Sequence, residues 1–210
     1  MTAQQGERDW WLRTLLVLVD PRPVFGALRD DSDDAAAARQ EPLAAIVFLA
    51  GIGGVLMTSI TGELLDDPEY DALLIAVWAI VAGAIHGIAA YFVVGVLVLL
   101  GASFLGGLGS FRRARHVLGF ASVPIAASLL VWPVRIAVYG EDPFRTGGSD
   151  TGTGNAIFEA LELGFLGWSV VLLAIGIRTV HGWSWPRTLA ATAVPALAPV
   201  LALLRAYGVI

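Results

Sequence analysis

Five long apolar segments dominate the sequence and occupy most of the chain from residue 42 to its end. They cover residues 42–60, 72–100, 117–138, 156–177 and 188–204. An apolar helix of about 20 residues crosses the hydrocarbon core of a bilayer, which is about 30 Å thick. Hydrophobic residues make up 57% of the chain and charged residues only 15%, too few to cover a water-soluble domain of this length. The sequence therefore predicts an all-α, polytopic membrane protein with five transmembrane helices.

The arginines fall on alternate connections between these segments. Ten of them lie before the first segment, between the second and third, and between the fourth and fifth: Arg8, Arg13, Arg22, Arg29, Arg39, Arg112, Arg113, Arg115, Arg178 and Arg187. The other side carries Arg145 and Arg205, and Arg135 lies within a segment. Basic residues that flank spans are retained on the cytoplasmic side. The pattern predicts a multi-pass protein of the cell membrane with a cytoplasmic N-terminus and an extracytoplasmic C-terminus.

Residues 1–41 are predicted to be a cytoplasmic region, and residues 42–210 a five-span membrane domain. Within the first region, residues 7–19 combine two tryptophans and several leucines with charged residues. Such a segment favours a short amphipathic helix that lies on the inner surface of the membrane. Residues 29–40 are rich in aspartate and alanine, and we expect them to form a solvated linker.

A second short helix is predicted between these two parts. Asp20 and Pro21 suit a helix cap followed by the first helical position. Val24, Phe25 and Leu28 would form the apolar face of this helix. The alternative is a frayed tail whose apolar residues pack on the spans.

The residue types that the chain lacks exclude several kinds of chemistry. Without cysteine there are no disulfides, thiolate metal sites or thiol nucleophiles, and without lysine there is no Ser/Lys dyad. Hydrolase, zinc-protease and phosphate-loop motifs are also missing, so we predict a non-enzymatic protein without cofactors. Its expected partners are the lipid bilayer and other membrane proteins or further copies of itself, and not nucleic acid. The lysine-free, aspartate-rich composition suggests a prokaryote of high-salt habitats, although a GC-rich genome would explain the missing lysines too.

Ionisable residues near the outer ends of the segments form the first candidate site. Arg135 lies about one turn inside the third segment, Glu159 and Glu162 lie on one face of the fourth, and Glu63 closes the first. A charge in hydrocarbon costs at least about 2.5–3.5 kcal/mol, so these groups should meet each other or a wet cavity. We predict an ion pair between Arg135 and Glu162, with Glu159 as the alternative partner. The cluster would be either an interhelical clamp or a substrate or ion site.

His86 is the second candidate, because it lies deep within the second segment. A histidine at this depth could relay protons or bind a metal. Ala89 and Ala90 occupy the positions where a second ligand on the same helix face would stand. Gly83 and Gly87 suggest instead a tightly packed helix face in which His86 is a hydrogen-bonded packing residue.

Arg112, Arg113 and Arg115 form a compact basic patch beside the third segment, the third candidate. Arginines at this position attract anionic lipid headgroups by about 1 kcal/mol each. The patch therefore suggests a lipid-headgroup site, and the alternative is that these residues serve only to set the topology.

Three sequence stretches occur in a characteristic order: a pre-membrane element at residues 20–28, a glycine-rich and basic connection at residues 105–115, and an aromatic-Ala-x-x-Pro motif at residues 119–124. Together they resemble the Yip-domain family of Rab-interacting membrane proteins, in particular its prokaryotic branch. The resemblance implies five spans and a cytoplasmic N-terminus. Eukaryotic members are membrane scaffolds in vesicle traffic, so it also implies a scaffold that organises membrane proteins or lipids. We expect oligomer contacts along its glycine-lined helices, although the same glycines would equally suit packing within the chain. A small transporter or channel subunit that uses the Arg/Glu cluster is the alternative, and a membrane enzyme is the third possibility.

Overall fold

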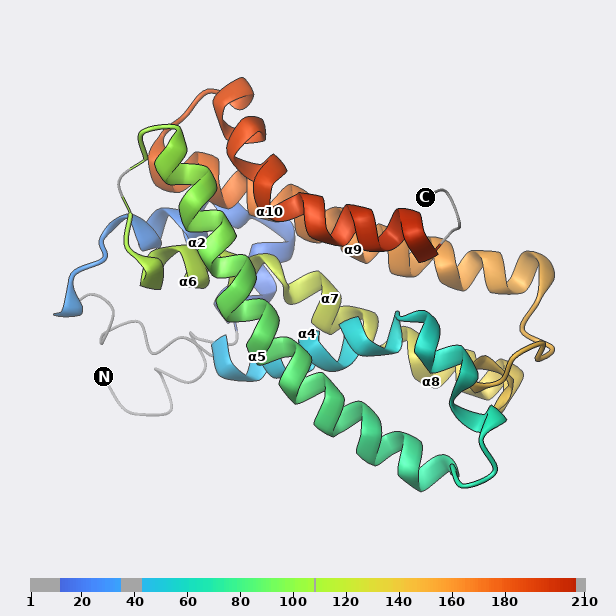
Figure 1. Cartoon of the computed structure of the whole chain (residues 1–210). Coiled ribbons are helices and arrows are strands. Elements are labelled where there is room, and N and C mark those ends of the chain that lie inside the picture. The colour runs from blue at the N-terminus through green and yellow to red at the C-terminus, as the bar shows by residue number, and fades with distance from the viewer. Residues whose placement is uncertain (1–11, 35–42, 108, 207–210) are drawn as a thin grey trace.

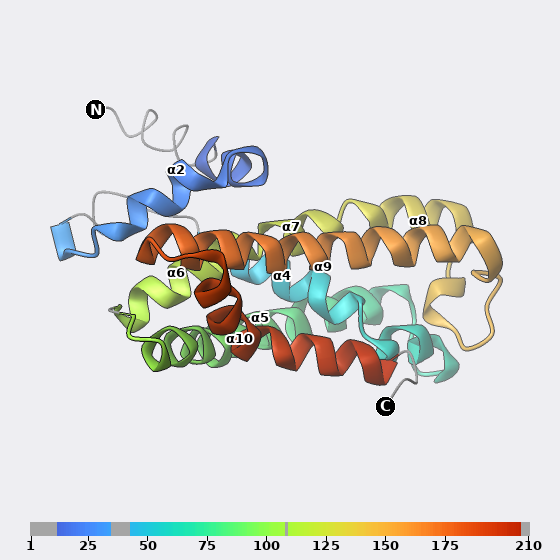
Figure 2. The ribbon, with the colours of Figure 1, turned by 90° about the horizontal axis from the view of Figure 1, so that it is seen from above.

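The computed structural model describes residues 12–34, 43–107 and 109–206, with residues 198–206 described by their backbone alone. Every regular element in this described part is helical, as the sequence predicts. The long helices run side by side as one elongated bundle, and the short N-terminal helices lie against one end of it (Figures 1 and 2).

The tightest helix pair is formed by α4 (Leu43–Leu56) and α5 (Ala72–Phe104). Gly51 of α4 faces Gly83 and Gly87 of α5, and a Cβ atom added to Gly51 would lie 2.7 Å from the Cα atom of Gly87. The two backbones can approach this closely only because these positions carry no side chain. The glycine pattern of the second segment is therefore explained by packing within the chain.

The second apolar segment forms one continuous helix, so it is not a pair of spans. The 33 residues of α5 extend about 50 Å at 1.5 Å per residue, which is well beyond the hydrocarbon thickness. The helix must therefore tilt or project beyond the bilayer at one end, as the length of the segment predicts.

The third segment is a chain of three helices, α6 (Phe111–Ala121), α7 (Val123–Ser128) and α8 (Val131–Tyr139). Pro124 stands at the start of α7, where a missing N–H group is tolerated. The hydroxyl of Ser122 donates to the carbonyl of Gly119 at 2.8 Å and so satisfies a carbonyl at the break. Breaks of this kind are what the prolines of the segment predict.

The last two helices are α9 (Gly152–His181) and α10 (Trp185–Ala206). Gly182 ends α9 in a left-handed conformation, with φ of 66°, which glycine adopts without steric cost. Figure 1 shows that α10 turns sharply after its first turns and then runs along the bundle. Pro195 and Pro199 lie in this helix and remove backbone donors, which accounts for a bend there.

Within the described residues, three helical segments are long and apolar enough to cross a membrane: Ala72–Phe104, Phe111–Tyr139 and Gly152–His181. A fourth would be α4 together with η2 (Ser59–Asp66), two helices bent by 66° relative to each other. The structure therefore supports three or four spans by length and composition. The expected count of five also needs α10 as a span.

The N-terminal region folds back onto the bundle. Residues 12–19 are helical, and α2 (Pro21–Gly26) and η1 (Ala27–Arg29) follow. Val24, Phe25 and Leu28 are buried against α6 and α9, as predicted for the apolar face of the second helix. Asp20 precedes Pro21 as expected, but its side chain makes no capping hydrogen bond, so the predicted cap is wrong in this detail.

The helix at residues 12–19 exposes most of its large apolar side chains, whereas those of α2 and η1 are buried. Leu12, Leu15, Leu16 and Val19 follow helical spacing and are exposed, whereas Val17 is buried in the main core. An exposed apolar stripe next to a membrane bundle suits the interfacial position predicted for this segment. The first part of that prediction, residues 7–11, lies outside the described residues.

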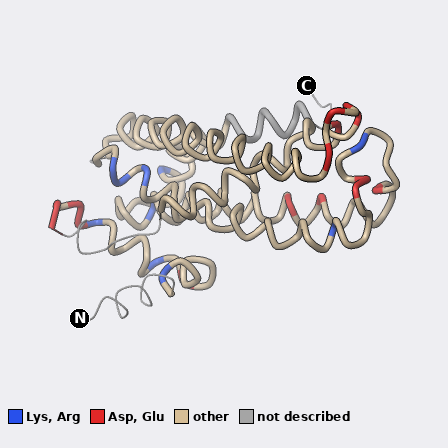
Figure 3. The backbone as a smooth tube through the Cα atoms, turned by 90° about the horizontal axis from the view of Figure 1, so that it is seen from below, with Lys and Arg blue, Asp and Glu red and all other residues tan. Residues whose placement is uncertain are grey.

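The two ends of the bundle differ in charge (Figure 3). Arginines gather around α6 and the N-terminal helices, which we call the arginine-rich end. Acidic residues gather at the opposite, acidic end around η2 and η3 (Asp142–Phe144), and the aspartates of residues 30–34 lie at the arginine-rich end. This separation follows the alternation of arginines along the sequence.

Candidate functional site

Arg135 is the centre of a polar cluster at the acidic end. The residue is only 9% exposed. Its Nη1 atom lies 3.5 Å from Glu162 Oε1, and its Nη2 atom lies 3.0 Å from Asp150 Oδ2 and 2.9 Å from Asn155 Oδ1. The predicted ion pair between Arg135 and Glu162 is therefore present, but Asp150 is the closer carboxylate.

Glu159 and Glu63 do not contact Arg135 directly. The side-chain amide of Asn155 donates to Glu159 Oε1 at 2.9 Å, so Glu159 is connected to Arg135 through Asn155. Glu63 is exposed on η2, and the structure does not bring it into the cluster.

Sequence reasoning missed Asp150 and Asn155. Asn155 could have been found, because it lies four residues before Glu159 and therefore on the same face of α9. Asp150 lies in a loop, and only the folded loop brings it to Arg135.

The cluster is closed on one side by Trp132, whose ring centroid lies 5.1 Å from the Cζ atom of Arg135. Trp132 also stacks on Phe144 at 5.6 Å, in a small second core beneath η2 and η3. Among the described residues, the Nε atom of Arg135 and the Nε1 atom of Trp132 are buried and have no hydrogen-bond partner. The guanidinium of Arg135 thus ties α8 to α9 and to the loop before α9. A water molecule or another acceptor could satisfy the two unpartnered N–H groups of Arg135 and Trp132.

His86 lies between the buried and the lipid-facing sides of α5. Its side chain is exposed, and a Cβ atom added to Gly54 of α4 would lie 3.2 Å from the Nε2 atom of His86. The described part of the chain offers no hydrogen-bond partner to His86 and holds no group of three potential metal ligands. The expected hydrogen bond is therefore missing there, whereas the expected packing beside a glycine is present.

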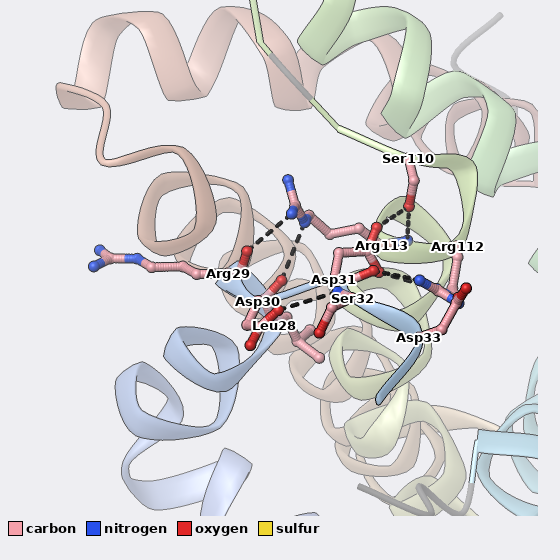
Figure 4. A network of polar contacts seen from close by, with 9 residues as sticks. All are labelled: Leu28, Arg29, Asp30, Asp31, Ser32, Asp33, Ser110, Arg112 and Arg113. Carbon is pink, nitrogen blue, oxygen red and sulfur yellow. Dashed lines mark hydrogen bonds and ion pairs between the residues drawn. The ribbon is translucent and has the colours of Figure 1, made fainter. Parts of the chain in front are cut away.

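The basic patch at the arginine-rich end binds the aspartates that precede α4 (Figure 4). Arg112 pairs with Asp31, Nε to Oδ1 at 3.0 Å, and with Asp33, Nη1 to Oδ1 at 2.7 Å. The Asp31 carboxylate also accepts a hydrogen bond from the hydroxyl of Ser110. Residues 29–33 are therefore tied to the bundle by these contacts, although all of them except Asp31 remain exposed, as expected for a solvated linker.

Arg113 extends the same contact to η1. Its Nε atom donates to the carbonyl of Leu28 at 3.1 Å, and its Nη2 atom donates to the carbonyl of Arg29 at 2.9 Å. Arg29 in turn donates to the carbonyl of Thr179 on α9 at 2.9 Å. We call the set of Arg29, Asp31, Asp33, Ser110, Arg112 and Arg113 the N-terminal clamp.

The clamp makes the docking of the N-terminal segment dependent on pH. Partial burial opposes ionisation of Asp31, but hydrogen bonds from Ser110 and Arg112 outweigh it and lower the pKa of the Asp31 carboxyl below its usual value. A lowered pKa in the folded state stabilises docking above the ordinary aspartate pKa of about 3.9. This stabilisation is lost as the pH falls through the lowered pKa.

We therefore expect hydrogen exchange in α2 and η1 to be slow at neutral pH and to accelerate below about pH 4 relative to α5, since the ordinary aspartate pKa marks the upper edge of this window. Asp31→Asn should accelerate exchange already at neutral pH. Asp34→Asn is the control, because Asp34 is exposed and makes no contact with the clamp arginines. Equal exchange in both variants and the unchanged protein would contradict a role of Asp31 in docking.

Arg115 differs from its two neighbours in the basic patch. Its Cζ atom lies 5.4, 4.9 and 4.6 Å from the ring centroids of Tyr91, Phe92 and Phe111. No carboxylate of the described residues pairs with Arg115, and its buried Nε atom has no hydrogen-bond partner there. The patch is thus divided into two arginines of the clamp and one arginine in an aromatic cage.

The glycines expected to line oligomer contacts are used inside the chain. A Cβ atom added to Gly53 would lie 3.1 Å from Ser128 Oγ, and one added to Gly101 would lie 3.4 Å from the carbonyl carbon of Ala191. Gly164 and Gly167 of α9 have nothing within 4 Å of such an atom. The glycines of α4 and α5 are therefore explained by packing within one chain and do not indicate contacts between copies of it.

A small cavity lies at the arginine-rich end between α5, α6 and α9. It measures about 20 Å³ and is lined by apolar residues together with Ser110, Arg113 and His181. This volume is about what one water molecule needs, so the cavity has no room for a lipid chain.

These features define an α-helical, multi-pass membrane protein whose buried charges are tied to one another by interhelical contacts. The Yip1 domain model matches residues 15–206, and the chain belongs to the Yip1 domain family. Neither a curated protein nor a solved structure matches the chain.

Proposed function

We propose that the protein is a non-enzymatic scaffold of the cell membrane that organises membrane proteins or lipids. The observation that carries the proposal is the Arg135 cluster, where one arginine joins α8, α9 and the loop between them through Glu162, Asn155 and Asp150. Such a contact fixes the relative positions of the helices, which supports a structural role for the cluster. Family membership supports the same reading.

We further propose five spans, with α4 and η2 as the first and α10 as the last. The arginine-rich end then faces the cytoplasm and the acidic end faces outward, because basic flanks are retained inside. Fluorescent and alkaline phosphatase reporters fused in turn to each terminus test this topology. Activity of the periplasmic-type reporter is expected at the C-terminus alone, and both termini in one compartment would contradict the five-span arrangement.

The scaffold role is tested by crosslinking the tagged chain in native membranes and capturing it in mild detergent. We expect the captured material to contain other membrane proteins in a fixed ratio to this chain. Capture of an equally abundant control protein with a similar number of spans should yield at most traces of them. Purification of the chain alone would contradict the proposal.

A small transporter or channel subunit is the second candidate. The unpartnered donors of Arg135 and Trp132 favour it, because they leave room in the cluster for a bound acceptor. Its test is proton or solute flux into vesicles that contain the purified protein, compared with the Glu162→Gln variant. Flux that depends on Glu162 would support the transporter and argue against a purely structural cluster.

A further inference from the structure

We propose that Arg115, held in the cage of Tyr91, Phe92 and Phe111, is a binding site for the phosphate of an anionic phospholipid in the inner leaflet. The inference deepens the proposed function by naming one lipid class and one residue. The sequence predicts a lipid-headgroup site at three arginines, and we now assign it to Arg115 alone. Arg112 and Arg113 belong to the N-terminal clamp, whereas Arg115 lies among aromatic rings.

The three arginines of the patch differ in their charge balance. Arg112 is paired with Asp31 and Asp33, and Arg113 donates to two backbone carbonyls. Both side chains are therefore occupied by the N-terminal clamp. Arg115 has no such acidic partner among the described residues. A guanidinium at the border of the hydrocarbon without a counter-ion is costly, so a bound anion would stabilise it.

The geometry of the cage suits a phosphate ligand. Three aromatic rings lie within 5.4 Å of the Arg115 Cζ atom. The rings themselves are in contact, since Tyr91 and Phe92 are 5.7 Å apart and Phe92 and Phe111 are 6.2 Å apart. A planar guanidinium held by aromatic rings keeps its N–H groups free at its edge, and that edge matches the oxygens of a phosphate. The cage orients Arg115 before any ligand arrives, which lowers the entropic cost of binding.

The cage lies at the depth of the phosphates in the bilayer. Asp71 caps the N-terminus of α5 at the acidic end, where its carboxylate accepts a hydrogen bond from the backbone N–H of Leu74. Of the two placements open to α5, the upright one lets the helix project beyond the bilayer at the arginine-rich end. It puts Tyr91 about 29 Å further along at 1.5 Å per residue, close to the thickness of the hydrocarbon core. Tyr91 and Phe92 thus fall at the inner interface, the level at which aromatic residues and phosphates both lie.

The test measures lipid binding to the purified full chain by native mass spectrometry in detergent, with phosphatidylglycerol, phosphatidylcholine and inorganic phosphate as probes. We expect phosphatidylglycerol to bind most tightly. Arg115→Gln should weaken its binding about fivefold, since one arginine near a charged surface contributes about 1 kcal/mol. Arg115→Lys keeps the charge but loses the planar edge, so it should keep only part of the affinity. The matched control is Arg112→Gln, which removes the same charge from the same helix and should retain the lipid.

Three results would overturn the site: no loss in Arg115→Gln, an equal loss in Arg112→Gln, or equal binding of the two lipids. Binding of inorganic phosphate with the same dependence on Arg115 would assign the site to free phosphate and overturn the lipid. If the Arg115 variants do not fold, a photoactivatable phosphatidylglycerol on the unchanged protein decides the question. Labelling is expected on residues 91–95 and 111–115, and labelling elsewhere overturns the proposal. If the protein still captures its membrane-protein partners but binds both lipids equally, the lipid site is contradicted and the scaffold role is not.

Discussion

Replacing Gly51 with valine is expected to destabilise the protein by about 3 kcal/mol or more and so to lower its melting temperature. A Cβ atom at this position would collide with the carbonyl oxygen of Gly83 and lie 2.7 Å from the Gly87 Cα atom. Both obstacles are backbone atoms, so α4 and α5 would have to move apart along their whole contact. Thermal unfolding in detergent, followed by the far-UV circular dichroism signal, measures the effect.

Gly164→Val is the matched control for this change. Gly164 also lies within a long helix, but nothing stands within 4 Å of a Cβ atom added there. We expect its melting temperature to stay close to that of the unchanged protein, because exposed substitutions usually alter stability by less than about 0.5 kcal/mol. Similar losses in both variants would show that the α4–α5 contact does not depend on Gly51.

The second large effect is expected at the Arg135 cluster. Arg135→Met should cost about 3–5 kcal/mol, because it leaves buried carboxylates without their cation. The side chains of Glu162 and Asp150 are only 12% and 13% exposed, so water cannot take over the role of Arg135. Thermal unfolding of Arg135→Met, Glu162→Leu and the double variant gives a double-mutant cycle for the pair.

We expect the double variant to be less destabilised than the sum of the two single changes, by about 1–3 kcal/mol. Recovery should be incomplete, because Asp150 and Asn155 lose their contacts with Arg135 in the double variant too. Glu141→Leu is the control, since it removes only the exposed pair of Arg145 and Glu141, which should contribute less than about 1 kcal/mol. Additive losses in the cycle would argue against a direct interaction between Arg135 and Glu162.

A folded double variant also separates the two interpretations of the cluster. If it still captures the same membrane proteins, the cluster acts as an interhelical clamp. If it folds but loses capture or flux, Arg135 and Glu162 take part in function directly.

Much of the candidate site could be predicted because local spacing carries the information. Glu159 and Glu162 lie three residues apart on one helix, and the cost of buried charge requires Arg135 to meet an acid. The position of Asp150 could not be predicted in this way, since it depends on how the loop after η3 returns to α8. Likewise, the spacing of residues 30–34 gives no sign that they would dock on Arg112, which lies about eighty residues away.

The sequence by itself determined that this chain is helical, that it belongs in a membrane, and where its apolar faces and proline breaks lie. These properties follow from composition and short-range periodicity, which act through solvent transfer and local backbone geometry. Only the tertiary structure decided that the glycines of α4 and α5 pack within one chain, that two of the three patch arginines hold the N-terminal segment, and that Arg115 lies among aromatic rings. Those outcomes depend on which helices become neighbours, and that choice is made by packing over the whole bundle.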